Sequence, residues 1–167
     1  MNKIYILILS ILTTAPLLSQ KLADISMIWE SRYDIIDLGE SANRIQASLR
    51  IPFEIDVAGI VKVNGLTSTG SSFQSRWETV KDFRIANENR RFNLNLRQLY
   101  LEKNIADLRI QFGAIPSIKK SVSSTGLGSN GWIDGFRIDQ NTGIGTFEIA
   151  AGSINEINNP NYFDREF

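Results

Sequence analysis

The sequence contains no cysteine and no histidine. Without cysteine, the chain has neither a disulfide framework nor a thiolate metal site. Without histidine, it lacks the commonest general base, the usual zinc ligand and any Ser-His-Asp arrangement. Asp134, Asp139 and Asn141 lie near a glycine turn and offer oxygen ligands for Ca²⁺, but their spacing matches no full loop motif. We therefore expect no catalytic residues, no metal site and no cofactor, and we predict that the protein is not an enzyme; a membrane-embedded barrel enzyme is the alternative that the absence of histidine ranks last.

The sequence also lacks an excess of charge and, after its first twenty residues, a long apolar run. Lys and Arg together number 18, as do Asp and Glu, so the formal net charge is zero. Nucleic-acid binding needs clustered positive charge, so we expect no nucleic-acid partner. No apolar run approaches the roughly 18 residues of a spanning helix. A mature chain that enters a membrane must therefore do so as strands.

The first twenty residues have the layout of a secretory signal peptide. Lys3 lies near the start, an apolar run covers positions 4–9, and small and polar residues lead to Gln20. The apolar core is too short to span a membrane comfortably, which argues against an anchor. No cysteine follows it, which argues against a lipoprotein. We predict a cleaved signal peptide over residues 1–20, with the exact bond left open, and one exported domain over residues 21–167.

Residues 44–57 alternate strictly between apolar and polar side chains, apart from Pro52. Such alternation puts the two sets on opposite faces of one strand. Soluble strands usually have about 5–6 residues and membrane-spanning strands roughly 9–11. The length favours a membrane strand, and an unusually long, half-buried soluble strand is the alternative. Pro52 conflicts with a closed sheet because it lacks an N–H, and a bulge there would remove the conflict.

Other segments repeat this alternation, and Gly- or Asn-rich turns separate them. No long stretch has the spacing of an amphipathic helix. We predict an all-β fold: an antiparallel transmembrane β-barrel of seven or eight strands, or an incomplete part of one. Trp29, Trp77 and Trp132 are interpreted as an interface belt, with core aromatics of a soluble fold as the alternative. The further predicted strands cover residues 25–38, 92–103, 106–114, 132–139 and 143–153.

Several short motifs resemble the Gram-negative outer-membrane porin family. They are RQLYLE at 97–102 followed by LRIQFG at 108–113, STGL at 124–127, GWIDG at 131–135 and YFDR at 162–165. The resemblance implies a large barrel that passes small solutes, with charged residues lining its lumen. Such porins have many more strands than this chain provides. We therefore favour the amino-terminal portion of a larger barrel over a closed eight-stranded barrel with a filled interior.

Charged residues on the polar faces are the candidate site. We predict that the protein lies in outer-membrane lipid and lets small hydrophilic solutes diffuse passively, and a homo-oligomer is one assembly that this leaves open. The alternative is a secreted soluble β-barrel or sandwich that binds a small apolar ligand or a protein partner, in which the same charges are structural pairs. The expected pore-lining residues are Arg44, Arg50, Glu54, Asp56, Arg97, Asp107, Arg109 and Arg137.

Overall fold

The computed structural model describes residues 23–37, 41–73, 75–83, 92–119, 122–123, 128–154 and 159–165. The predicted signal peptide (residues 1–20) and the STGL motif (residues 124–127) both lie outside these ranges. Across the described ranges the chain is all-β, as predicted, and nine strands form one antiparallel sheet. Among these residues no helix is long and apolar enough to cross a membrane.

The strands follow one another as a meander, with the order β1-β3-β4-β6-β7-β10-β11 in the main sheet. β8 and β9 form a separate two-stranded sheet. The bounds are β1 (Ala23–Ile25), β2 (Ile28–Asp37), β3 (Ser41–Val57), β4 (Val61–Ser68), β5 (Glu78–Asp82), β6 (Asn95–Ile105), β7 (Leu108–Pro116), β8 (Ile118–Lys119), β9 (Val122–Ser123), β10 (Trp132–Thr142), β11 (Gly145–Ser153) and the 3-10 helix η1 (Tyr162–Asp164).

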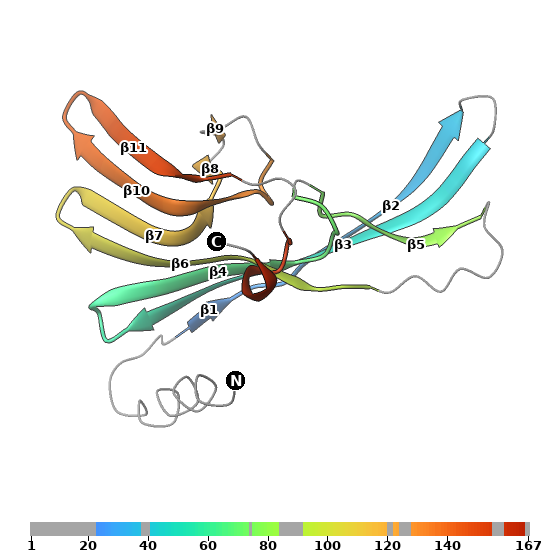
Figure 1. Cartoon of the computed structure of the whole chain (residues 1–167), viewed down its shortest axis with the longest axis horizontal. Coiled ribbons are helices and arrows are strands. Elements are labelled where there is room, and N and C mark those ends of the chain that lie inside the picture. Colours follow the sequence, from blue (N-terminus) through green and yellow to red (C-terminus); the bar gives the residue numbers. More distant parts are fainter. Residues whose placement is uncertain are drawn as a thin grey trace.

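β3 organises the amino-terminal half of the sheet. It is 17 residues long and extends the predicted alternating strand at its start. β1 and β2 pair with one of its edges, and β4 and β5 pair with the other. Figure 1 shows β2, β5 and the adjoining part of β3 extending together away from β6, β7, β10 and β11.

Pro52 is accommodated by a break in the neighbouring strand, and the predicted bulge is absent. The pairing of β3 with β4 runs without a register shift through Pro52 and Leu66. On the other edge, Ser26 lies between β1 and β2, and its N–H donates to the Pro52 carbonyl at 3.2 Å. The nitrogen and carbonyl of one strand residue point to the same edge. The register of β1 and β2 on β3 is the same, so Ser26 lies opposite Pro52 and its carbonyl faces the nitrogen that has no hydrogen. The missing N–H therefore interrupts the ladder at this point and separates β1 from β2.

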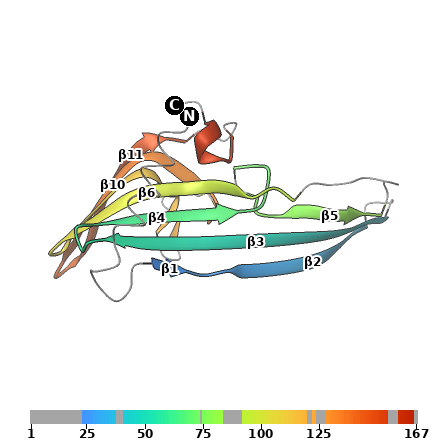
Figure 2. The same cartoon turned by 90° about the horizontal axis from the view of Figure 1, so that it is seen from below.

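The sheet curves but does not close, because β11 does not pair with β1 or β2 within the described ranges. This arrangement is consistent with an incomplete barrel. Figure 2 shows η1 on the side toward which the sheet curves, above β6 and near β11. We call this side the concave face and the opposite side the convex face.

A row of three glycines crosses the curved part of the sheet. Gly113, Gly135 and Gly152 are cross-strand partners in β7, β10 and β11. A Cβ atom at Gly135 would lie 2.1 Å from a backbone oxygen of β11, and one at Gly152 would lie 2.6 Å from a backbone oxygen of β10. On one side of the row Phe112 is 65% exposed, whereas Ala114 on the other side is buried. The absent side chains let these strands approach closely and bend.

Candidate functional site

The convex face carries a row of apolar side chains that crosses all seven strands of the sheet path. Its exposed members include Leu101 at 47%, Phe112 at 65% and Phe136 at 39%. On this face of β3, Ala47 is buried, Ile45 is exposed, and the other apolar residues are half-buried. The row consists of Ala23, Ile55, Val63, Leu101, Phe112, Phe136 and Ala151 in successive strands.

The neighbouring row on the concave face is polar. Asp56, Lys62, Glu102, Gln111 and Arg137 are successive cross-strand partners in β3, β4, β6, β7 and β10. Gln111 and Arg137 are 4% and 1% exposed, so the curvature of the sheet covers them. One side of the sheet is therefore polar and partly buried, while the other is apolar and partly exposed.

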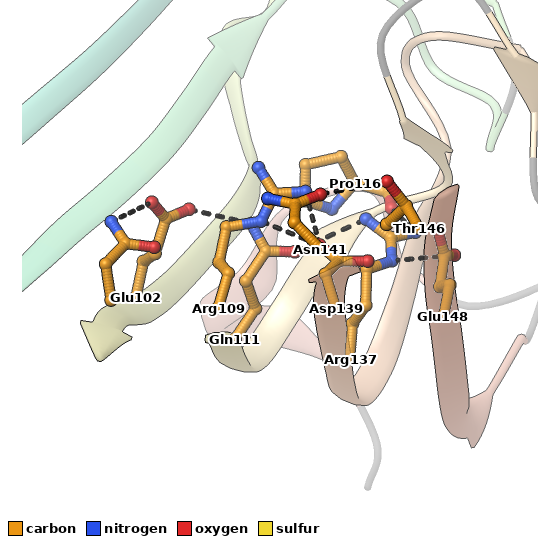
Figure 3. Close-up of polar contacts among 10 residues, drawn as sticks. Glu102, Arg109, Gln111, Pro116, Arg137, Asp139, Asn141, Thr146 and Glu148 are labelled. Atoms are coloured by element: carbon orange, nitrogen blue, oxygen red, sulfur yellow. Dashed lines mark hydrogen bonds and ion pairs between the residues drawn. The ribbon is translucent and has the colours of Figure 1, made fainter. Parts of the chain in front are cut away.

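Hydrogen bonds connect Glu102, Gln111 and Arg137 of this polar row, as Figure 3 shows. The Gln111 amide donates to Glu102 at 2.8 Å, and Arg137 Nη1 donates to the Gln111 side-chain oxygen at 3.3 Å. Arg137 also forms an ion pair with Glu148 of β11 at 3.2 Å and donates to the Pro116 carbonyl at 2.8 Å. The Arg137 guanidinium thus links β7, β10 and β11 and is compensated by a carboxylate.

A second charged pair lies at the start of β7. Arg109 Nε donates to Asp139 Oδ2 at 2.7 Å, and its Nη2 donates to the same oxygen. Asp139 is 3% exposed, whereas the Arg109 side chain is 34% exposed. The pair borders a polar cavity of about 300 Å³ that Glu102, Asp107 and Thr146 also line. The cavity opens between the turns that join β6 to β7 and β10 to β11.

Six of the eight predicted pore-lining residues lie on the polar side of their strands, but they do not form one cluster. Arg50, Glu54 and Asp56 lie along β3, and Glu54 pairs with Lys62 at 2.7 Å. Arg44 lies on the same strand in the arm, where Asp82 of β5 is a cross-strand partner. Arg109 and Arg137 occupy the positions in β7 and β10 described above.

Asp107 does not lie on a strand face. The sequence predicts a strand from position 106, but Ala106 has a φ of 49° and forms the β6–β7 turn with Asp107, so β7 begins at Leu108. The Asp107 carbonyl accepts a hydrogen bond from the Asn141 N–H at 3.0 Å. Asp107 is therefore an exposed residue at the rim of the polar cavity and not part of a strand lining.

Arg97 is fully buried and does not present its charge to a lumen. The register between β4 and β6 passes from Leu66–Gln98 to Thr67–Leu96, which leaves Arg97 as the extra residue of a β-bulge. Its guanidinium donates to the carbonyls of Ser72 at 2.7 Å, Ser75 at 3.0 Å and Thr69 at 3.1 Å, and also to those of Gly70 and Phe73. Arg97 at the bulge therefore holds the backbone of the segment after β4 in place through hydrogen bonds to carbonyls between Thr69 and Ser75.

Trp132 belongs to a buried cluster and not to an interface belt. It is fully buried, and its ring centroid lies 4.3 Å from that of Phe73. Tyr162 of η1 packs against this cluster. By contrast, Trp29 is 59% exposed and keeps its predicted surface position.

The sequence does not predict the role of Arg165, which holds the segment of residues 159–165 on the concave face. Its guanidinium lies 3.8 Å from the Trp132 ring centroid and forms an ion pair with Asp134 at 2.9 Å. It also donates to the Asn159 carbonyl at 3.1 Å and to the Arg97 carbonyl. Burial lowers the pKa of Arg165, and Asp134 opposes that shift. These partners are distant in sequence, so no local pattern identifies them.

Comparisons with protein-family models, with curated proteins and with solved structures find no match to this chain. The resemblance of its motifs to porins therefore stays a prediction. Among the residues that the structure describes, no group of three or more acidic side chains is placed to hold a metal ion. The functional argument accordingly depends on the two faces of the sheet.

Proposed function

We propose that this chain forms part of an outer-membrane β-barrel whose polar concave face lines a path for passive diffusion of small hydrophilic solutes. The observation that carries the proposal is the apolar row of the convex face, which crosses seven strands and stays exposed in its middle. In a water-soluble fold such a row would cover the core. Lipid tails give it an apolar environment without a second layer of protein.

Strand length supports the same proposal. β6 and β10 have 11 residues each, and β7 and β11 have 9 each. A tilted strand needs roughly 9–11 residues to cross the hydrocarbon core. The unpaired edges at β11 and at β1 and β2 would be costly in lipid. The proposal therefore includes closure of the sheet by further strands or by another copy of the chain.

The inner charges fit a pore with weak overall ion selectivity. Arg109 is paired with Asp139, Arg137 with Glu148, and Lys62 with Glu54. Paired charges on a pore wall can form hydrogen bonds with water and polar solutes, but their opposite signs leave only a small net electrostatic field in the pore. The chain has no nucleophile–base arrangement that includes histidine. The absence of enzymatic activity stays a prediction.

The competing function is a secreted soluble binder with its apolar face inside. The buried cluster of Phe73, Ala114, Trp132 and Tyr162 favours it, because that cluster is a small apolar core. The exposure of Phe112, Phe147 and Ile149, each above 60%, argues against it. The soluble alternative needs a partner to cover these side chains.

Cell fractionation and bilayer recording test the proposal. The full chain, expressed in a Gram-negative host, should sediment with outer membranes, resist a urea wash and require detergent for extraction. Detergent-purified protein should give stepwise conductance in planar bilayers. Recovery from the periplasm without detergent would contradict the membrane location, and membrane-bound protein without conductance steps would contradict the open path.

A further inference from the structure

A cavity of about 390 Å³ lies on the polar side of β3, β4 and β6. Cross-strand partners build its wall: Pro52, Leu66 and Gln98 form one row, and Glu54, Asn64 and Tyr100 form the next. Arg50 lines it beyond Pro52 along β3. Pro52 and Leu66 give the wall an apolar centre, while Arg50 and Asn64 give it polar ends. The cavity can hold a small solute with one polar and one apolar part.

Two hydrogen-bond donors of this cavity have no partner within the described ranges. Asn64 is 7% exposed, and its Nδ2 atom is buried without a hydrogen bond. The Nε atom of Arg50 is also buried without one, and no hydrogen bond or ion pair joins Arg50 to the described residues. A buried donor without an acceptor is destabilising, and more so when it is charged. Both atoms therefore favour an acceptor from outside the chain.

Three other polar residues of the wall already have partners. Glu54 is bound to Lys62 at 2.7 Å, and the Gln98 amide donates to the Gly131 carbonyl at 2.7 Å. Asp24, the second acidic residue of the wall, also has an interaction partner. Among the charged residues that line the cavity, Arg50 is the one for which no ion pair with a described residue is formed, and the nearby Glu30 carboxylate that acts on it is paired with Arg76 at 3.0 Å. A carboxylate matches this combination, since it is anionic and accepts hydrogen bonds on two oxygens.

We propose that this cavity binds small organic monocarboxylates, with Arg50 on the carboxylate at one end, with Pro52 and Leu66 against the hydrocarbon part of the ligand, and with Asn64 at the other end of the cavity. This inference rests on the proposed function and adds to it the class of solute that the concave face selects. Weak binding is the useful regime for a solute that must also leave. We expect a dissociation constant in the millimolar range.

Titration of the full chain in detergent micelles tests the site with three isosteric probes. Butyrate should bind, while butyramide and butylammonium should bind at least about tenfold more weakly, since each loses a charge-assisted hydrogen bond or meets Arg50 with like charge. Equal binding of butyrate and butylammonium would overturn the proposal. Failure of butyrate to bind at all would also overturn it.

Three substitutions test the residues of the site. Arg50→Gln should weaken butyrate binding about tenfold or more, and Asn64→Asp should weaken it as well, because it adds a negative charge to the cavity. Lys81→Gln removes one positive charge from the exposed strand β5, outside the cavity, and should leave butyrate binding unchanged. An equal loss in Arg50→Gln and Lys81→Gln would refute a local site in favour of general charge attraction.

A second variant guards against misfolding of Arg50→Gln. Arg50→Lys keeps the charge but removes the planar donor fork, and it should retain butyrate binding with an affinity reduced about threefold to tenfold. Unchanged affinity in this variant would refute the role of the Nε atom. Binding of butyrate without conductance would contradict the proposed transport alone. Conductance without butyrate binding, or without an Arg50-dependent preference for butyrate, would contradict the carboxylate site alone.

Discussion

Substitution of Phe112 by arginine tests directly which medium covers the convex face. Phe112 is the central residue of β7, is 65% exposed, and has Leu101 and Phe136 as cross-strand partners in the apolar row. If this row faces lipid, an arginine at mid-strand lies near the bilayer midplane. Arginine at that depth of a barrel costs about 2–4 kcal/mol, whereas near the interface it costs about 0–1 kcal/mol.

The soluble alternative predicts a much smaller effect. Exchange of an exposed side chain in water usually changes stability by no more than about 0.5 kcal/mol. Loss of the cross-strand apolar contacts adds roughly 0.2–1 kcal/mol in either medium. The two hypotheses therefore differ by more than 1 kcal/mol for Phe112→Arg, which equilibrium unfolding resolves.

The assay is urea unfolding of the full chain folded into lipid vesicles, followed by tryptophan emission. Ile144→Arg is the matched control, because Ile144 is 92% exposed in the β10–β11 turn and lies outside the strands. We expect Phe112→Arg to lower the free energy of unfolding by about 2–4 kcal/mol and Ile144→Arg by less than about 1 kcal/mol. Equal effects of the two substitutions would refute the assignment of the convex face to lipid.

Three further predictions concern the concave face and the curvature. Asp139→Asn should destabilise the fold by about 1–3 kcal/mol because it leaves Arg109 partly buried without its carboxylate, and the double variant with Arg109→Gln should recover part of this loss in a double-mutant cycle. Arg165→Gln should cost about 2 kcal/mol and shift the tryptophan emission to the red, since the segment that covers the buried cluster is released; unchanged emission would contradict this role. Gly135→Ala should lower the free energy of unfolding by about 1–3 kcal/mol, because the new Cβ atom would overlap the backbone of β11. Gly143→Ala is the control, because no atom lies within 4 Å of its added Cβ atom, and thermal unfolding should show almost no change in stability.

Alternation predicts the strands and their two faces because side chains of a strand point to opposite sides with a period of two. The long strand and the antiparallel succession follow from this pattern. Within the described ranges the main sheet has nine strands where seven or eight were expected, because the first predicted strand is divided into β1 and β2 and because β4 is a separate strand after the turn at residues 58–60. A period of two does not show that Pro52 interrupts the strand paired with it.

Arg97 was predicted on the wrong surface although the sequence contained a signal. Apolar residues occupy positions 94 and 96, and then 99 and 101, so the alternation changes phase at Arg97. A single extra residue restores both pairs to one face, which is what a β-bulge provides. A change of phase within a strand is therefore evidence for a bulge, and the residue at the change is removed from either regular face.

The cluster around Arg165 had no comparable signal, because its partners come together only through the curvature of the sheet. Asp134 and Trp132 lie about thirty positions before Arg165, and the Arg97 carbonyl that it binds lies 68 positions before it. Burying a guanidinium is favourable only when acceptors satisfy most of its donors. The fold meets this condition for both Arg97 and Arg165 with backbone carbonyls.

The distribution of satisfied and unsatisfied charge on the concave face connects the fold to the proposed function. Arg97, Arg137 and Arg165 are buried and bonded, so they hold loops and strands in place and cannot attract a solute. Arg50 differs, because it borders a cavity and lacks an acceptor among the described residues. Arg97 and Arg137 also leave the Nε atom without a hydrogen bond, but their other guanidinium nitrogens are bonded to carbonyl groups. Supplying an acceptor to Arg50, or removing its charge, would therefore be expected to increase stability. Retaining it beside an apolar wall is therefore best explained by an acceptor that arrives with the solute.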